Sequence, residues 1–204
     1  MALTAADYQQ FSHDMLNIVG RLQSAVELAQ INEVELLNLI NTDIESLTRA
    51  IKLFAALGWC ASTPPTETRT KVDVSTLIFE IANMHRADNT LIAIDENVFL
   101  ETQPALLRLI VEELLYNMQA HSNPLEPAKM TLQNTSKGYQ LQCTNITAET
   151  LPQTPENLYT KSRKSKGLGL GLPMVRRAAE LLGAAFEFRC DGSTVTTTLL
   201  LPRG

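Results

Sequence analysis

The chain has 204 residues and a formal net charge of −5, with 45% hydrophobic and 19% charged residues. This composition is ordinary for a soluble globular protein, and the length allows one large domain or two small ones. The acidic balance argues against non-specific nucleic-acid binding, which normally requires a basic surface. Three cysteines without metal-type spacing favour a reduced, cytoplasmic setting. We find no signal peptide and no apolar run of the roughly 20 residues that span a bilayer, so we expect no membrane partner.

The first 58 residues contain no proline and predict a helical hairpin. Apolar residues recur every three or four positions in two runs, which places a continuous apolar stripe on each helix. The stripes consist of Phe11, Met15, Ile18, Leu22, Ala25 and Ala29, and of Ile40, Ile44, Leu47, Ile51 and Phe54. A hairpin alone buries only one side of each helix. We therefore expect a homodimer in which two hairpins form a four-helix bundle.

The segment ASTPPTETRT is rich in proline and threonine, which is typical of a linker. The sequence therefore predicts a hairpin domain over 1–60, a linker over 61–70 and a second domain over 71–204. In the second domain we expect helices at 74–86, 103–122 and 172–183, and strands at 89–98, 128–136, 139–147, 184–191 and 194–202. This order predicts the α+β class, with an α/β sandwich in which helices cover one face of a mixed sheet.

The segment FSHDMLN places a histidine on the first predicted helix. If Phe11 lies on the buried stripe, His13 lies about 200° further round the helix and faces solvent, and Asn17 shares its face. An exposed imidazole can act as a nucleophile when its other ring nitrogen is held, and Asp14 could accept that proton. Asn17, one turn away, could orient a water. An incidental surface histidine among ordinary polar residues explains the same pattern.

A second pair of polar residues, Glu113 and Asn117, is spaced i to i+4 on the helix predicted at 103–122. Both side chains offer oxygens suited to Mg²⁺, which keeps several waters and takes few protein ligands alongside phosphates. The alternative is a helix face that is turned to water.

The segment KGLGLGL concentrates three of the nine glycines, Gly167, Gly169 and Gly171, at the start of a predicted helix. Glycines let backbone N–H groups approach an anion, and the N-terminus of a helix favours negative charge. Three lysines just upstream, Lys161, Lys164 and Lys166, could close over a polyphosphate. Without context, such a loop is more often a flexible solvated connection.

The order of these motifs resembles the catalytic core of two-component sensor histidine kinases, and the resemblance covers nearly the whole chain. It implies that residues 1–60 are a dimerisation and phosphoacceptor hairpin. SHDMLN is similar to the phosphoacceptor box of this family. His13 would then be the phosphorylated residue, Asp14 its acidic assistant, and Asn17 the amide implicated in the phosphatase reaction of the family.

The same resemblance implies that residues 71–204 are an ATP-binding domain of the gyrase–Hsp90–kinase type. ELLYNMQAHS is similar to the asparagine box, in which Asn117 would bind Mg²⁺ with support from Glu113. GLGLGL is similar to the glycine-rich box that holds the phosphates of ATP. The cofactors implied are therefore ATP and Mg²⁺.

One departure from the family pattern follows the strand predicted at 139–147. The family usually has an Asp-x-Gly box there, and the aspartate accepts a hydrogen bond from the adenine amino group. This chain has Thr144, Asn145 and Ile146 in that region. The carbonyl of Asn145 can accept the same bond without charge. Losing one well-placed bond would weaken nucleotide binding by about 1–3 kcal/mol.

The resemblance implies a soluble, sensor-less histidine kinase that transfers the γ-phosphate of ATP to His13 and then to an aspartate on the receiver domain of a response regulator. A separate protein would supply the sensor. A second interpretation is a relay histidine phosphotransferase with a degenerate ATP domain. A third is a non-catalytic scaffold or inhibitor of a kinase or regulator, in which His13 is dispensable.

Overall fold

The structure is a computed structural model that describes residues 15–22, 24, 33–62, 68–95, 97–147 and 171–203. The chain divides into two compact units, Met1–Pro64 and Pro65–Gly204. This boundary falls within the segment 61–70, although the long helix of the first unit continues to Ser62. None of the helices in the described residues is both long enough and apolar enough to cross a membrane.

The first unit is helical throughout its described residues, with a segment over 15–22 and the helix α2 (Glu33–Ser62). An ion pair joins them: Nη2 of Arg21 lies 2.8 Å from Oδ1 of Asp43, whose carboxylate is buried. Two residues of the predicted α2 stripe, Ile44 and Ile51, remain about half exposed in the single chain, at 48% and 51%. This leaves apolar surface on α2, and the dimeric bundle remains a prediction.

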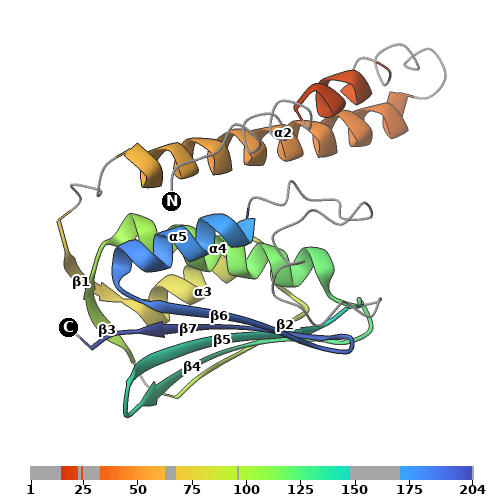
Figure 1. Ribbon diagram of the computed structural model, residues 1–204. Helices are drawn as coiled ribbons and strands as arrows, with labels where there is room; N and C mark the ends of the chain where they lie inside the picture. The colour runs from red at the N-terminus through yellow and green to blue at the C-terminus, as the bar shows by residue number, and fades with distance from the viewer. Residues whose placement is uncertain are drawn as a thin grey trace. The chain divides into compact units, whose positions relative to one another are not determined.

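The second unit combines three helices with two sheets. In chain order its elements are β1 (Thr70–Asp73), α3 (Val74–Met84), β2 (Thr90–Ile94), β3 (Phe99–Thr102), α4 (Pro104–His121), β4 (Ala128–Thr135), β5 (Gly138–Ile146), α5 (Gly171–Leu182), β6 (Ala185–Asp191) and β7 (Thr194–Leu201). The larger sheet has the order β2-β4-β5-β7-β6, and only its β2–β4 pair is parallel. The three helices cover one face of this sheet (Figure 1). The predicted α+β class and mixed sheet are therefore confirmed.

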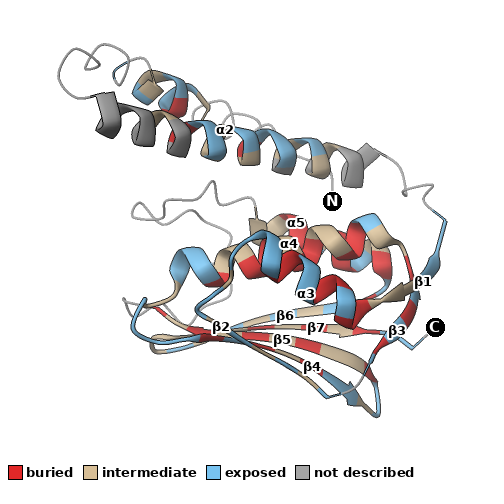
Figure 2. Cartoon of the chain, turned by 180° about the vertical axis from the view of Figure 1, so that it is seen from behind, coloured by how far each residue is buried: buried red, intermediate tan, exposed pale blue. Residues whose placement is uncertain are grey.

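The core lies between that sheet face and the helices, where the buried residues gather (Figure 2). Side chains alternate across a strand, and burial on β5 follows this period through Leu141, Cys143 and Asn145. The largest fully buried side chains are Ile78, Ile81, Leu106, Leu107, Ile110, Leu114, Leu115, Met130, Leu132, Leu141 and Met174. Burying each such side chain contributes about 1.5–3 kcal/mol, so this interface fixes the position of the helices over the sheet.

The strand predicted over 89–98 is present as β2, but its predicted end was wrong by four residues. β2 ends at Ile94, and a separate strand, β3, pairs antiparallel with β1 in a two-stranded sheet. The chain turns away because Val98 is held by α3: its carbonyl accepts from Val74 N–H at 2.9 Å, and its own N–H donates to Oγ of Ser75 at 3.0 Å. Such long-range contacts leave no signal in local periodicity.

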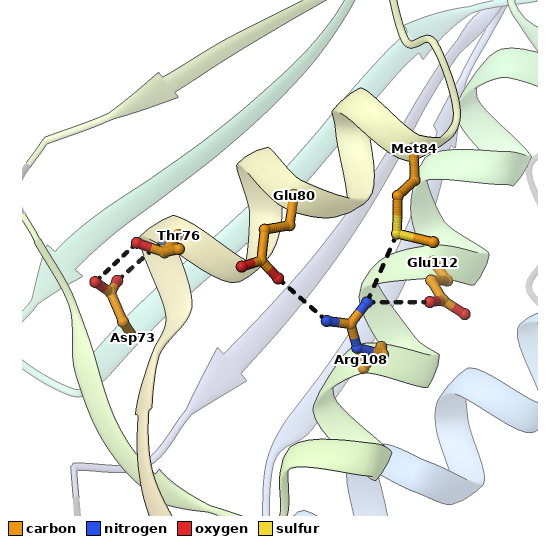
Figure 3. Close-up of polar contacts among 6 residues, drawn as sticks. All are labelled: Asp73, Thr76, Glu80, Met84, Arg108 and Glu112. Carbon is orange, nitrogen blue, oxygen red and sulfur yellow. Dashed lines mark hydrogen bonds and ion pairs between the residues drawn. The ribbon is translucent and has the colours of Figure 1, made fainter.

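Polar contacts hold α3 at its N-terminus and along its outer face (Figure 3). At its N-terminus the carboxylate of Asp73 accepts from the backbone N–H of Thr76 at 3.0 Å and from its hydroxyl at 2.9 Å. On its outer face, the guanidinium of Arg108 on α4 donates to Glu80 at 3.2 Å. It also lies 3.7 Å from the carboxylate of Glu112. Arg108 thus joins α3 to α4.

We predict that replacing the cap of α3 lowers stability in a pH-dependent way. The backbone N–H of Thr76 holds the pKa of Asp73 below its ordinary value of 3.8. A lowered carboxyl pKa stabilises the fold above the unfolded pKa, and this contribution is lost as the pH falls through the folded pKa. Asp73→Ala should therefore lower the thermal midpoint at pH 7, and its difference from the unmodified chain should shrink below about pH 3.8.

The matched control is Asp73→Asn, because asparagine also caps helices but does not titrate. Its midpoint should lie close to that of the unmodified chain at pH 7, when unfolding is followed by circular dichroism. If Asp73→Ala melts like the unmodified chain at pH 7, the cap does not stabilise α3.

Candidate functional site

The first residue of α5 lies against two polar side chains of α4. A Cβ atom added to Gly171 would lie 2.9 Å from Oε2 of Glu113 and 3.4 Å from Nδ2 of Asn117. Real Cβ atoms essentially never approach within 3.0 Å of another heavy atom, so a side chain at position 171 would require a shift, and the atom that it meets is the end of the flexible Glu113 side chain. The structure therefore brings together the last glycine of KGLGLGL and the Glu113–Asn117 pair, which lie more than 50 residues apart in the sequence.

Glu113 is buried, with 7% of its surface exposed, so the alternative of a helix face turned to water does not hold for this residue. Glu113 and Asn117 continue a stripe that begins with Leu106 and Ile110, at steps of four, three and four residues. This spacing places all four on one side of α4. α5 packs against α4, and its buried residues include the small Ala178 and Ala179. The stripe was visible in the sequence but was not used to predict the burial of Glu113.

The amide of Asn117 has an unsatisfied donor. Its Nδ2 atom is buried and has no hydrogen-bond partner in the described part of the chain. A buried donor left without an acceptor costs about 1–3 kcal/mol, which an incoming acceptor such as a phosphate oxygen would recover. α5 begins at Gly171, beside this amide. The first N–H groups of a helix have no acceptor within the helix, so they can donate to an anion. The arrangement fits an anionic ligand.

The oxygens of Glu113 and Asn117 also suit a hard divalent cation. The described residues contain no group of three or more histidine, cysteine, aspartate or glutamate side chains that could hold a metal ion. A cation bound here would therefore need ligands from water and from the anion itself. Mg²⁺ has this preference, because it keeps several waters and binds through few protein groups plus substrate phosphates. The residues present fit Mg²⁺ bound together with a phosphate-bearing ligand.

Asn145 lies on the helix-facing side of β5, near the strand's end, and is 6% exposed. Two backbone contacts hold this end of β5. The N–H of Asn123, just after α4, donates to the carbonyl of Ile146 at 2.6 Å. The N–H and hydroxyl of Thr147 both donate to the carbonyl of Ser193, at 2.8 and 3.0 Å. The Ser193 contact has no sequence signal, and it ties β5 to the turn between β6 and β7.

Cys143 precedes Asn145 on the same buried face and is not a nucleophile. Burial raises the pKa of its thiol to about 12, although a hydrogen bond with Thr197 partly opposes this. Burial also raises the pKa of the Cys190 thiol. Both side chains are therefore neutral near pH 7, as expected for ordinary small residues in a core.

Several predicted site residues lie outside the described residues: His13, Asp14, Lys161, Lys164, Lys166, Gly167 and Gly169. Asn17 is described, and it lies exposed on the helical segment 15–22. Among the predicted site residues, the structure thus brings Glu113, Asn117 and Gly171 into contact distance. It places Asn145 on the sheet face below the helix layer that carries them.

The chain is similar to known proteins in sequence and in fold. The sequence over residues 102–203, half of the chain, matches the family described as histidine kinase-, DNA gyrase B-, and HSP90-like ATPase. No curated protein has significant sequence similarity to the chain.

Three solved structures illustrate the fold. The Acinetobacter baumannii histidine kinase AdeS has a TM-score of 0.74 at 14% identity, over 94% of this chain and 98% of the other. Full-length ShkA in complex with AMPPNP has a TM-score of 0.61 at 14% identity, over 98% of this chain and 46% of the other. A bacterial phosphotransferase has a TM-score of 0.50 at 13% identity, over 98% of both chains.

At these identities the solved structures establish the fold alone, and it is the fold of a histidine kinase catalytic core. The family match to residues 102–203 includes α4, β5 and α5, which carry Glu113, Asn117, Asn145 and Gly171. The chain therefore belongs to the histidine kinase-, DNA gyrase B- and HSP90-like ATPases.

Proposed function

We propose that the chain is an ATP-dependent histidine kinase that phosphorylates His13 and passes the phosphoryl group to an aspartate on a response-regulator receiver domain. The observation that carries this proposal is the approach of Gly171 to Glu113 and Asn117, with a Cβ position only 2.9 Å from the carboxylate. The glycine lets the start of α5 approach the carboxylate and the amide that would bind Mg²⁺ and phosphate. Elsewhere in regular structure, glycine is destabilising by about 0.5–1 kcal/mol relative to alanine.

In this proposal the second unit binds and orients the triphosphate. The N–H groups at the start of α5 and the glycines Gly167 and Gly169 would donate to phosphate oxygens, and Lys161, Lys164 and Lys166 would neutralise their charge. Asn117 would offer its carbonyl oxygen to Mg²⁺, with Glu113 beside it. When bound, Mg²⁺ would neutralise the negative charge on the phosphate oxygens. Catalysis would then rest mainly on positioning and charge stabilisation.

The first unit would supply the nucleophile. A ring nitrogen of His13 would attack the γ-phosphorus, a new N–P bond would form, and the bond to the leaving ADP oxygen would break with its electrons on ADP. Asp14 would accept the proton of the other ring nitrogen. The receiver aspartate would later displace the phosphoryl group from His13. Asn17, exposed on the helical segment 15–22, would orient water for the opposing phosphatase reaction, in which water removes the phosphoryl group as free phosphate.

We further propose that two copies assemble through their hairpins in the cytoplasm, and that a separate protein senses the signal. The half-exposed Ile44 and Ile51 support the assembly, because a second hairpin would remove this apolar surface from water.

A relay histidine phosphotransferase is the second candidate. Asn145 stands where the kinase family usually has aspartate, and the solved phosphotransferase is similar over 98% of both chains. In that case phosphate would move between receivers through His13 without use of ATP.

The first experiment is phosphorylation of the purified full chain with Mg²⁺ and γ-labelled ATP. We expect label that is stable to alkali and labile to acid, as a phosphohistidine is, and expect His13→Ala to abolish it. Asn17→Ala is the matched control on the same helix face, and it should retain the label because its proposed role is in dephosphorylation.

The absence of both label and nucleotide binding would contradict the kinase. Transfer from a phosphorylated receiver onto His13 would then support the relay. A biological output that survives His13→Ala would instead support the scaffold.

The second experiment tests the helix contact itself. Gly171→Ala places a methyl group against the carboxylate of Glu113, so the Glu113 side chain or the start of α5 must shift. We expect affinity for Mg²⁺–ATP, measured by titration calorimetry, to fall by about tenfold or more, the cost of about one displaced hydrogen bond.

Gly58→Ala is the control, because a Cβ at Gly58 meets no atom within 4 Å. It should leave nucleotide affinity unchanged. Equal affinity of Gly171→Ala and the unmodified chain would show that the contact does not position the site.

A further inference from the structure

We propose that the base site of this chain accepts a 6-oxo purine nucleotide, such as GTP or ITP, alongside ATP, and that Asn145 is the residue that permits it. This inference rests on the proposed nucleotide site and concerns its choice of base. The argument begins with an unsatisfied atom. Nδ2 of Asn145 is buried and has no hydrogen-bond partner in the described residues, on a residue that is only 6% exposed.

The position of this amide is set by its surroundings. Asn145 lies on the helix-facing side of β5. The carbonyl of the next residue, Ile146, accepts a hydrogen bond from the N–H of Asn123 at 2.6 Å. Asn117 lies one turn before the end of α4 at His121. Asn145 and the Gly171–Asn117 contact therefore both lie toward the end of the helix layer where α4 finishes. A nucleotide whose phosphates lie at Gly171 would carry its base toward this part of the sheet.

Neighbouring polar groups do not compete for the amide. The hydroxyl of Thr147 donates to the carbonyl of Ser193 at 3.0 Å, and the thiol of Cys143 is paired with Thr197. The register places Asn145 opposite Val195, which is buried and has no side-chain polar group. The amide donor of Asn145 is thus buried without a partner in the described residues, so an incoming acceptor would recover the cost of its burial.

The chemistry of the amide differs from that of the family's aspartate. An ionised carboxylate only accepts hydrogen bonds, so it selects the 6-amino group of adenine and repels the 6-oxo group of guanine or hypoxanthine. An amide has one acceptor and one donor group on the same planar head. Its oxygen can accept from the 6-amino group of adenine. After a half-turn about the last side-chain bond, its nitrogen can donate to a 6-oxo group. The same buried side chain therefore satisfies either purine.

The test measures binding of nucleotides rather than phosphorylation. The full chain, with Mg²⁺, is titrated with ATP, GTP and ITP by calorimetry. ITP separates the 6-oxo group from the 2-amino group that guanine also carries. For the unmodified chain we expect the dissociation constants of GTP and ITP to lie within about tenfold of that of ATP, since each base makes one bond with the amide.

Asn145→Asp removes the donor and keeps the shape of the side chain. At pH 8, where the carboxylate is ionised, this variant should bind GTP and ITP at least about tenfold more weakly, relative to ATP, than the unmodified chain does. Asn134→Asp is the matched control on the adjacent strand β4. Asn134 is exposed and accepts from the guanidinium of Arg203, a role that aspartate retains. It should leave the ratio of the dissociation constants unchanged.

If Asn145→Asp does not fold, Asn145→Ala replaces it. This variant lacks both donor and acceptor. It should therefore weaken the binding of ATP and the binding of GTP to a similar degree. Binding of ATP with GTP and ITP at least about a hundredfold weaker in the unmodified chain would overturn the inference while leaving the nucleotide site intact. Binding of no nucleotide at all would instead overturn the proposed function, and the base inference with it.

Discussion

The proposed nucleotide site depends on the close packing of α5 against α4. A side chain at Gly171 would meet the carboxylate of Glu113, which would have to move from its place beside Asn117. This close packing places the N-terminus of α5 beside the amide of Asn117, whose buried Nδ2 donor lacks a partner in the described residues. A helix terminus, a carboxylate and an amide thus meet at one point, where phosphate and Mg²⁺ can each find suitable ligands. The hydrophobic core holds this point in place, since both helices are anchored over the sheet by their apolar faces.

A similar arrangement recurs at Asn145. The backbone around it is fixed by long-range bonds from Asn123 and Thr147, and its amide is buried with an unused donor. Both asparagines therefore carry an unsatisfied donor in a pre-formed position, which costs stability in the free chain and is repaid when a ligand supplies the acceptor. This shared feature unites the phosphate and base ends of the proposed site. In the proposed function, Asn145 in place of the family's aspartate would therefore retain binding and change the choice of base.

The sequence predicted the α+β class, the three helices of the second unit and the order of its main strands, because each has strong local periodicity. The strands β1 and β3 were missed, since Val98 is turned away by contacts with Val74 and Ser75 that no local pattern reveals. Glu113 and Asn117 were identified as a pair from spacing and family resemblance. The burial of Glu113 was not predicted, although its place in the stripe after Leu106 and Ile110 could have indicated it. The contact with Gly171 depends on tertiary packing, so no reading of either motif alone could supply it.

The central claim is that the α4–α5 contact builds a site for a nucleotide with Mg²⁺. The most direct measurement is the affinity of the full chain for a fluorescent ATP analogue, with Mg²⁺ and with excess chelator, for the unmodified chain and for Asn117→Leu. The account predicts saturable binding that weakens by about tenfold or more without Mg²⁺, and a large loss of binding in the variant whether or not Mg²⁺ is present. Binding that is equally tight in all four conditions, or no binding in any of them, would contradict it.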